Sequence, residues 1–423
     1  MFCDLQSSVF RYMPQSFPSA CGDSFMRTRI VKPGQLTRDE LHVWHGMLRA
    51  NPVLNSPFFL PEFTLAMSAV HSGVRVIVSE QDGQPVAFLP FQPDQKGIAV
   101  SVGGSMNDFQ GLISEPDSDC SLVELLKLAS VSRFKCHKLL DWRNDLGDFV
   151  LSRSSSPIVN LARGFQSWKA DLQGHGSEQL KQLARKERKL ERECGSVRFE
   201  FRSMDPDVLQ TLIRWKRDQY LRTREVDIFS YDWTGRLLMR LLSSPQDSAL
   251  QPVLSAMYAG NKLVAAHYGL MSDTVCHWWF PVYDPEYGKY SPGKLLLCRI
   301  LEESAREGIV RFDFGAGDES YKYSFANDSV DICRTVIDRN AARRWLGSKS
   351  YQARMALKAS RLGPMFRDVR GRLRGLAKRL RGRNPTEAGS ATFKIGMQSA
   401  QGSEMDAGTI HVGRQTAETL SLR

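Results

Sequence analysis

The most constraining feature of this sequence is the order of its apolar segments between residues 197 and 337. Apolar runs with a two-residue period predict strands, and runs with a period near 3.6 predict helices. The predicted order is strand, helix, helix, three strands, helix and two strands, which favours a mixed sheet with flanking helices of the α/β or α+β class. The predicted strands are 197–201, 253–258, 263–271, 275–283, 310–314 and 331–337, and the predicted helices are 206–221, 234–242 and 292–308.

Residues 26–155 show a looser version of the same pattern. Thr37 and Glu40 form a capping box, which satisfies exposed backbone N–H groups at a helix start. The Asp82-Gly83 pair between two apolar runs predicts a hairpin. The remaining predicted elements are helices from residue 61 and at 121–130, and strands at 98–102 and 138–142. A first mixed-sheet unit is therefore predicted ahead of the second.

Positive charge is concentrated near the C-terminus. The chain has a net charge of +11, yet the stretch from Arg339 to Arg383 holds fifteen Lys or Arg residues and one acid, Asp368, so the rest of the chain is slightly acidic. Apolar residues recur in this stretch at spacings of three and four, which predicts a basic amphipathic helix. They are Leu362, Phe366, Val369, Leu373, Leu376 and Leu380. Such a helix suits an anionic membrane surface or a position docked on the domain. Nucleic acid is disfavoured, because no aromatic interleaving of the kind used for base stacking accompanies the arginines.

The eight cysteines include no CxxC pair, and none lies near a histidine at zinc-finger spacing. They are expected to be reduced thiols, and no metal site is predicted. The N-terminus lacks the apolar core of a signal peptide, and no run reaches the ~18 apolar residues of a spanning helix. A cytoplasmic protein is predicted, which the basic segment can bring to the inner face of the membrane.

A strand, a loop and a helix between residues 278 and 308 carry the first chemical feature. Ser291 followed by Pro292 is the expected start of a helix, with serine as the N-cap. A helix N-terminus presents free N–H groups to an anion. Gly293 permits close approach of a ligand to the backbone, and Lys289 or Lys294 adds a charge. These are the requirements for holding a pyrophosphate such as that of coenzyme A, although most helix starts of this kind bind nothing.

The second feature follows the strand at 310–314. Asp313 and Asp318 lie in a glycine-rich loop, and Tyr321 and Lys322 come directly after it. Glycines after a strand allow close approach, and either acid is placed to orient a hydroxyl nucleophile. A turn with solvated acids is the alternative reading.

Together these features resemble the CelD/BcsL-like acetyltransferases of cellulose and exopolysaccharide biosynthesis, a branch of the GNAT superfamily related to Fem-type aminoacyltransferases. The residues that carry the resemblance are Ala266-His267-Tyr268-Gly269-Leu270, Trp279, Tyr283-Asp284, Tyr290-Ser291-Pro292-Gly293, Asp313-Phe314-Gly315, Gly317-Asp318-Glu319 and Tyr321-Lys322. In the first half it rests on Asn51-Pro52, Asp82-Gly83, Leu89-Pro90 and Asn107-Asp108.

The resemblance implies tandem GNAT-like domains, of which only the second binds acyl-CoA. The expected parts are a disordered N-terminus (1–25), a first and degenerate domain (26–155), a Ser-rich linker (152–156), a second domain (156–338), a basic helical extension (339–383) and a disordered tail (384–423).

The implied reaction is transfer of an acyl group, acetyl in the first instance, from acyl-CoA to an amine or hydroxyl of a sugar or polysaccharide precursor. One alternative is a Fem-like aminoacyltransferase, against which the slightly acidic body of the chain argues. Another is a non-catalytic partner of a membrane polysaccharide synthase, bound through 339–383. That option stays open because this loop has one glycine where simple GNAT enzymes have two, and Pro292 removes an N–H donor.

Site residues follow from the resemblance and from chemistry. GNAT enzymes bring acceptor and thioester together, so the acceptor needs a general base. The predicted catalytic residues are His267 as first base, Asp313 as second, and Tyr321 or Tyr283 to reprotonate the thiolate. The predicted acyl-CoA residues are Tyr290, Ser291, Gly293 and Lys294, and the predicted acceptor residues are Tyr283, Asp284, Asp318 and Lys322. Cys276 is not favoured as a nucleophile, since His277 points to the opposite face of the strand.

Overall fold

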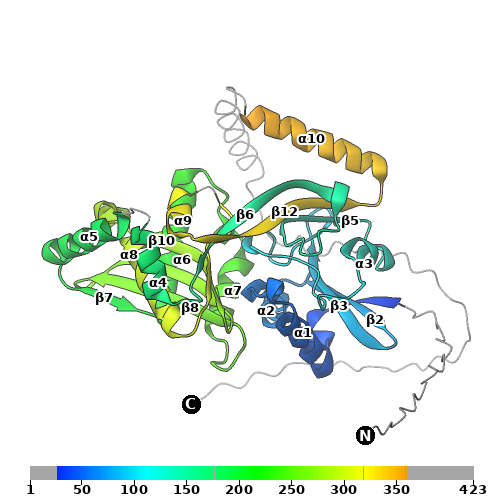
Figure 1. Cartoon of the computed structure of the whole chain (residues 1–423), viewed down its shortest axis with the longest axis horizontal. Helices are drawn as coiled ribbons and strands as arrows, with labels where there is room; N and C mark the ends of the chain where they lie inside the picture. The colour runs from blue at the N-terminus through cyan, green and yellow to red at the C-terminus, as the bar shows by residue number, and fades with distance from the viewer. Residues whose placement is uncertain (1–25, 175–177, 318, 360–423) are drawn as a thin grey trace, which may run out of the picture.

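The described strands join into one twelve-stranded mixed sheet that runs through both halves of the chain (Figure 1). The structure is a computed structural model and describes residues 26–174, 178–317 and 319–359. The strand order is β1-β2-β3-β4-β5-β12-β6-β11-β10-β9-β8-β7. Helices flank the sheet, so the predicted mixed α/β class is confirmed.

The bounds of the elements are as follows. The strands are β1 (Met26–Val31), β2 (Arg75–Gln81), β3 (Gln84–Pro93), β4 (Ala99–Val100), β5 (Arg133–Leu139), β6 (Val150–Asn160), β7 (Val197–Glu200), β8 (Gln251–Ala259), β9 (Lys262–Met271), β10 (Val275–Tyr283), β11 (Arg311–Asp313) and β12 (Asp328–Asp338). The α-helices are α1 (Arg38–Ala50), α2 (Pro61–Val70), α3 (Leu122–Leu128), α4 (Phe165–Gly174), α5 (Gln179–Cys194), α6 (Pro206–Thr223), α7 (Asp232–Leu242), α8 (Pro292–Arg306), α9 (Ser320–Phe325) and α10 (Ala341–Ala359).

The two halves repeat one succession of elements. The first runs β1, α1, α2, β2, β3, β4, α3, β5 and β6, and the second runs β7, α6, α7, β8, β9, β10, α8, β11 and β12, with α4 and α5 ahead of it and α9 inserted. In both halves the fourth and fifth strands, β4 with β5 and β10 with β11, are parallel neighbours. This internal repeat agrees with the expected tandem arrangement.

The last strands of the halves are exchanged. β6, from the first half, pairs with β11 of the second, and β12 pairs with β5 of the first. β6 and β12 also pair with each other along most of their length, from Asp328↔Ile158 to Thr335↔Val150. A boundary at residue 155/156 therefore cuts through a strand, and the predicted linker at 152–156 is wrong. Its serines alternate between faces of the sheet, and the fully buried Ser156 reaches the second half.

One hydrophobic core crosses the junction between the halves. It lies on the side of the sheet covered by α1, α2, α6 and α7, and it includes Trp44 and Phe63 from the first half and Leu237 and Tyr268 from the second. A second core lies on the other side of the second half, under α4, α5 and α8, and a third lies under α3. Figure 1 shows α2 beside α7, where the two halves meet.

Most predicted elements are confirmed within a few residues, but besides β6 several differ in substance. The strand predicted at 138–142 is β5, which ends at Leu139, because its pairing with β12 fixes the earlier residues in the sheet. β1, α4 and α9 were not predicted at all. β1 is an edge strand with little apolar alternation, and α4 buries mainly Trp168.

The chain beyond β12 continues into α10, the described part of the predicted basic extension. The apolar stripe from Leu362 to Leu380, and the segments 1–25 and 384–423, lie outside the described residues. No helix in the described ranges is both long and apolar enough to span a membrane.

Candidate active site

The centre of the second half is a fork between two parallel strands. β10 and β11 pair only from Val275↔Arg311 to His277↔Asp313, after which β11 ends and β10 continues to Tyr283. The pairing of β10 with β9 also shifts register between His277 and Phe280. Backbone groups of β10 beyond His277 therefore have no β11 partner.

His277 occupies the fork and faces the first half. Its Nε2 lies 2.8 Å from Oδ2 of Asp108, a first-half residue in the loop after β4. Its Nδ1 lies 3.8 Å from Oδ1 of Asp313, beyond hydrogen-bond distance. The imidazole is fully buried, and the Phe58 ring meets it edge to face at 4.9 Å between centroids. His277 is therefore buried like a core histidine, but it has a charged hydrogen-bond partner, Asp108, from the first half.

Asp108 is held in its ionised form. Its other oxygen, Oδ1, forms an ion pair with Lys138 of β5. Burial alone would raise the pKa of Asp108, but the Lys138 charge and the hydrogen bond with His277 outweigh burial and hold the pKa well below its ordinary value. A carboxylate that stays ionised near neutral pH can stabilise a protonated imidazole at His277.

Asp313 has one satisfied and one free oxygen. Oδ1 accepts hydrogen bonds from Ser156 Oγ at 3.0 Å and from the Gly315 backbone N–H at 2.9 Å. Oδ2 is buried and has no hydrogen-bond partner among the described residues. Gly315 has φ +67°, and a side chain there would collide with the Asp108 carboxylate. The loop after β11 therefore passes close to Asp108 only because residue 315 is glycine.

Tyr321 lies on the opposite face of the fork from His277. Its hydroxyl, carried by α9, accepts a hydrogen bond from Trp278 Nε1 at 3.0 Å. Burial raises the pKa of Tyr321 to about 12, so the phenol stays protonated near neutral pH. Trp278 belongs to the core under α8, whereas its neighbour His277 belongs to the other face.

His267 lies mid-sheet in β9, as expected, but in an apolar setting. Its ring stacks on Trp278 with centroids 4.1 Å apart, and neither ring nitrogen has a hydrogen-bond partner among the described residues. Burial, together with the charges of His277 and Lys216, lowers the pKa of His267 well below its ordinary value. The imidazole is therefore neutral and enclosed. Of the two histidines, His277 has the partners that a general base requires.

The start of α8 differs from the predicted cap. Ser291 is the N-cap, but it adopts a left-handed conformation, φ 57° and ψ 48°, and its side chain does not cap the helix. Its Oγ instead accepts a hydrogen bond from Lys186 of α5 at 2.7 Å. Tyr290 is buried and donates to Glu193 of α5 at 2.6 Å, so it fastens α5 to the loop.

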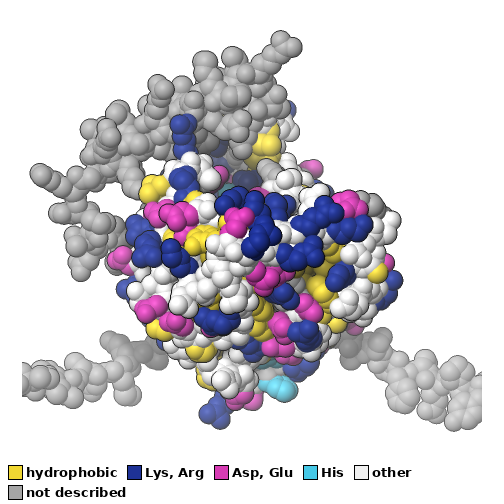
Figure 2. All heavy atoms as spheres, turned by 90° about the vertical axis from the view of Figure 1, so that its left-hand side faces the viewer, with side chains coloured by type: hydrophobic (Ala, Val, Ile, Leu, Met, Phe, Trp, Pro, Cys, Tyr) yellow, Lys and Arg dark blue, Asp and Glu magenta, His cyan; other side chains and the backbone are white. Residues whose placement is uncertain are grey.

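A cavity of about 220 Å³ lies between α5 and the start of α8. It is lined by Glu178, Gln179, Gln182, Leu183, Lys186, Ser291 and Lys294. Figure 2 shows the face that carries α5, where lysine and arginine side chains gather among scattered acids. Two lysines, a hydroxyl and a helix N-terminus make this cavity suitable for a diphosphate.

The remaining predicted residues have structural partners. The Tyr283 ring is 45% exposed and lies 3.3 Å from where a side chain at Gly293 would begin, so Gly293 makes room for Tyr283. Asp284 caps the turn at Pro285–Tyr290 by accepting from the Glu286 N–H. Among the described residues, neither Tyr283 nor Asp284 forms a hydrogen bond or an ion pair with His277 or Asp313.

Lys322 is buried beside the loop after β11. It donates to the Gly315 carbonyl at 3.4 Å and pairs with Glu319 at 3.1 Å. Lys216 of α6, which sequence reasoning missed, is also buried, and burial lowers the pKa of Lys216 to about 8. Asp318 lies outside the described residues.

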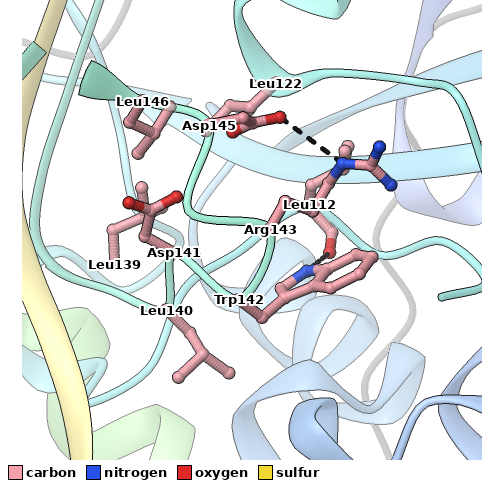
Figure 3. A pocket seen from close by; sticks show the side chains of 9 residues that line it. All are labelled: Leu112, Leu122, Leu139, Leu140, Asp141, Trp142, Arg143, Asp145 and Leu146. Carbon is pink, nitrogen blue, oxygen red and sulfur yellow. Dashed lines mark hydrogen bonds and ion pairs between the residues drawn. The ribbon is translucent and has the colours of Figure 1, made fainter.

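A second hollow lies in the first half (Figure 3) and measures only about 10 Å³, enough for one water molecule. Its polar residues have partners of their own, since Trp142 Nε1 donates to the Leu112 carbonyl and Arg143 pairs with Asp145. Among the described residues no group of three or more His, Cys, Asp or Glu side chains is arranged to hold a metal ion. The fork and the α5–α8 cavity therefore remain the candidate site.

Residues 177–323 match a family described as an acetyltransferase (GNAT) domain. The chain contains a GNAT-type acyltransferase domain. The matched residues run from the start of α5 into α9, so they include the cavity, both sides of the fork and Tyr321. They span less than half of the chain, and the first half with Asp108 lies outside the match. A comparison with curated proteins finds no match.

Several solved structures are similar to this chain at low identity. The C-terminal domain of a putative lysylphosphatidylglycerol synthetase from Agrobacterium fabrum is 14% identical, with TM-score 0.46, and the alignment covers 73% of this chain and 94% of that one. FemX is 11% identical, with TM-score 0.46 and coverage of 67% and 93%. A tandem GNAT protein from the clavulanic acid biosynthesis pathway is 10% identical, with TM-score 0.43 and coverage of 74% and 98%.

Proposed function

We propose that this protein transfers an acyl group from acyl-CoA to an amine or hydroxyl acceptor at the fork between β10 and β11. The observation that carries the proposal is the arrangement of His277 and Tyr321 on opposite faces of the fork, within the segment that matches the acetyltransferase family. One group on each side suits a reaction that removes a proton from the acceptor and returns a proton to the departing thiolate.

The residues at the α5–α8 cavity fit the diphosphate of acyl-CoA. The positive end of the α8 dipole and the ammonium groups of Lys186 and Lys294 supply positive charge around the cavity, although Pro292 has no N–H and the N–H groups of Lys294 and Leu295 donate to the Ser291 carbonyl. Gln179 and Gln182 add neutral hydrogen-bond donors, and Glu178 is the one acid in the lining. Bound acyl-CoA supplies the activated thioester.

The described residues then divide the chemistry between the two faces. His277 accepts the proton of the attacking amine or hydroxyl at Nδ1, since Nε2 is engaged with Asp108. Asp108 stabilises the resulting imidazolium and fixes the orientation of the ring. A carboxylate hydrogen-bonded to the other ring nitrogen commonly has this role beside a catalytic histidine. Tyr321, protonated near neutral pH, donates a proton to the thiolate.

For the acceptor we propose a sugar or a polysaccharide precursor. The support is the resemblance of residues 266–322 to the acetyltransferases of cellulose and exopolysaccharide biosynthesis. The slightly acidic charge of the chain outside residues 339–383 disfavours a tRNA-borne donor, because tRNA binding relies on phosphate contacts with basic surfaces.

Calorimetric titration of acetyl-CoA into the full-length protein tests the proposal. Replacing both cavity lysines (Lys186→Ala with Lys294→Ala) is expected to weaken acetyl-CoA binding by ~30-fold or more, since each charge-assisted contact contributes ~1–2 kcal/mol. Lys189→Ala on the same helix is the matched control, because Lys189 pairs with Glu193 at 3.9 Å and does not line the cavity. A folded protein without acetyl-CoA affinity would contradict the proposal, and binding of aminoacyl-tRNA alone would replace it with a Fem-type reaction.

Release of free thiol from acetyl-CoA in the presence of cello-oligosaccharides or glucosamine tests the chemistry. His277→Ala is expected to lower turnover by at least ~100-fold, the scale of general base catalysis, with the acetyl-CoA affinity unchanged. His267→Gln is the comparison, and it is expected to act on stability far more than on kcat. The reverse pattern would return the base to His267.

A further inference from the structure

Helix α10 turns an apolar face away from the protein. Trp345 is 61% exposed, Leu346 is 59% exposed and Leu357 is 39% exposed. At about 100° per residue these three side chains, with Ala353, fall within one third of the helix circumference. A helix of a globular domain ordinarily turns such a stripe toward the core, so this face has the opposite orientation to the usual one.

The opposite side of α10 is fixed to the protein. The Tyr351 hydroxyl hydrogen-bonds Ser152 of β6 at 2.9 Å, and the Arg334 guanidinium of β12 lies over the Tyr351 ring. Arg344 lies over the Phe149 ring at 5.0 Å. These contacts set the rotation of the helix, which lies along the outer side of β6 and β12 in Figure 1. The outward direction of the Trp345 face is therefore defined by the fold.

Cationic residues lie within and beside this face. Lys349 lies within it, Arg343 and Arg354 lie along one edge, and α10 contains no Asp or Glu. The sequence continues with the same bias, since fifteen Lys or Arg residues and one acid occur between residues 339 and 383. An apolar stripe with a cationic border matches the depth profile of an anionic bilayer, where acyl chains lie beneath negatively charged headgroups.

We infer that the outward face of α10 binds the surface of an anionic phospholipid bilayer, with Trp345, Leu346 and Leu357 inserted among the lipids and the neighbouring lysine and arginines on the headgroups. Nucleic acid matches the charge, but its phosphates gain nothing from the exposed Leu346 and Leu357 that share this face with Trp345. Binding at this face would hold the acyltransferase domain at a membrane, on the side of the sheet junction formed by β6 and β12.

Vesicle flotation with the full-length protein tests this inference. The probes are vesicles of phosphatidylglycerol and phosphatidylcholine in equal parts and vesicles of phosphatidylcholine alone. We expect binding to the anionic vesicles at least ~10-fold stronger than to the neutral ones, and weaker binding as salt is raised from 50 to 500 mM, because exposed charges are screened. Equal binding to both vesicles, or no binding to either, would overturn the inference.

Two variants distinguish the outward face from charge alone. The double substitution Trp345→Ser with Leu346→Ser is expected to lower vesicle affinity at least ~10-fold while leaving the acetyl-CoA affinity unchanged. Leu221→Ser is the matched control, because Leu221 is 70% exposed on α6 and lies outside α10. Retained vesicle binding in the double variant refutes the inference. A different outcome would also refute it: the parent protein is a dimer in light scattering and does not bind vesicles, and the double variant is a monomer. The outward face of α10 would then bind a second copy of the chain.

Discussion

The contact between Asp108 and His277 joins two residues 169 positions apart in the chain, one from each half. Sequence reasoning noticed both residues without connecting them. Asp108 belonged to the Asn107-Asp108 pair of the resemblance, and His277 was considered only as a partner for Cys276. Cys276 does face α8 while His277 faces the first half, as alternation along a strand requires. A pattern along one chain cannot supply the register between two halves, so this pair could not be predicted.

The substitution Asp108→Asn tests the Asp108–His277 contact through the pH dependence of the protein's stability. The folded pKa of Asp108 lies below its ordinary value, so its carboxylate contributes stability that is fully present above pH ~4 and is lost as pH falls toward the folded pKa. Because Asp108 and Lys138 are partly exposed, we expect a loss of ~2 kcal/mol at pH 7. Urea unfolding of the parent and the variant between pH 7 and pH 3 checks this. If the difference in unfolding free energy between parent and variant grew as the pH fell, the assignment of an ionised Asp108 would be contradicted.

Gly315→Ala tests the close approach of the loop to the same carboxylate. A side chain at residue 315 meets both a positive φ and the Asp108 carboxylate, so we expect a loss of ~2 kcal/mol in stability and a fall in kcat with little change in acetyl-CoA affinity. Gly235→Ala is the matched control, because nothing lies within 4 Å of an added side chain there and residue 235 is inside α7. The control should gain up to ~1 kcal/mol in thermal unfolding. Equal effects of Gly315→Ala and Gly235→Ala would show that the close contact between the loop and the Asp108 carboxylate contributes nothing to stability or turnover.

At the scale of elements, capping and turn residues predicted where helices begin, whereas strand pairing determined which further segments became strands. The Thr37–Glu40 capping box and the start of α8 at Pro292 were both readable from a few residues. The predicted linker at 152–156 became part of β6 because β12 pairs along it. Serine has low strand preference, so only tertiary pairing could place it there. The register shift of β10 against β9 between His277 and Phe280 likewise has no signal in composition.

Substitutions at Ser291, the N-cap of α8, test whether backbone conformation or side-chain capping determines the preferred residue there. Because Ser291 has a positive φ and no capping hydrogen bond, the position favours glycine over any branched residue. Ser291→Gly is expected to be close to neutral for stability, whereas Ser291→Val should cost ~2 kcal/mol through backbone strain. Chemical denaturation of the two variants measures the difference. Equal destabilisation by glycine and valine would contradict a strained conformation at Ser291.

At the scale of the whole molecule, the exchange of β6 and β12 makes each half depend on the other. The tandem arrangement was predicted, but as two units separated near residue 155. In the structure neither unit is complete alone, since removal of one half deprives β5 or β11 of a neighbouring strand. The core on the α1, α2, α6 and α7 side is also shared. The candidate site depends on the same junction, because Asp108 and Ser156 reach the fork from the first half.

This dependence predicts unfolding of both halves in one step. Phe63→Ala removes a fully buried ring of α2 that contacts Trp279 of β10, and we expect a loss of ~3–4 kcal/mol. Hydrogen exchange read by mass spectrometry separates the halves by peptide. If unfolding is cooperative, exchange should accelerate by the same factor in β2 and β3 and in the distant β8 and β9, since all require the same global opening. Faster exchange confined to β2 and β3 would show that the halves unfold separately, and that strand exchange alone does not couple them.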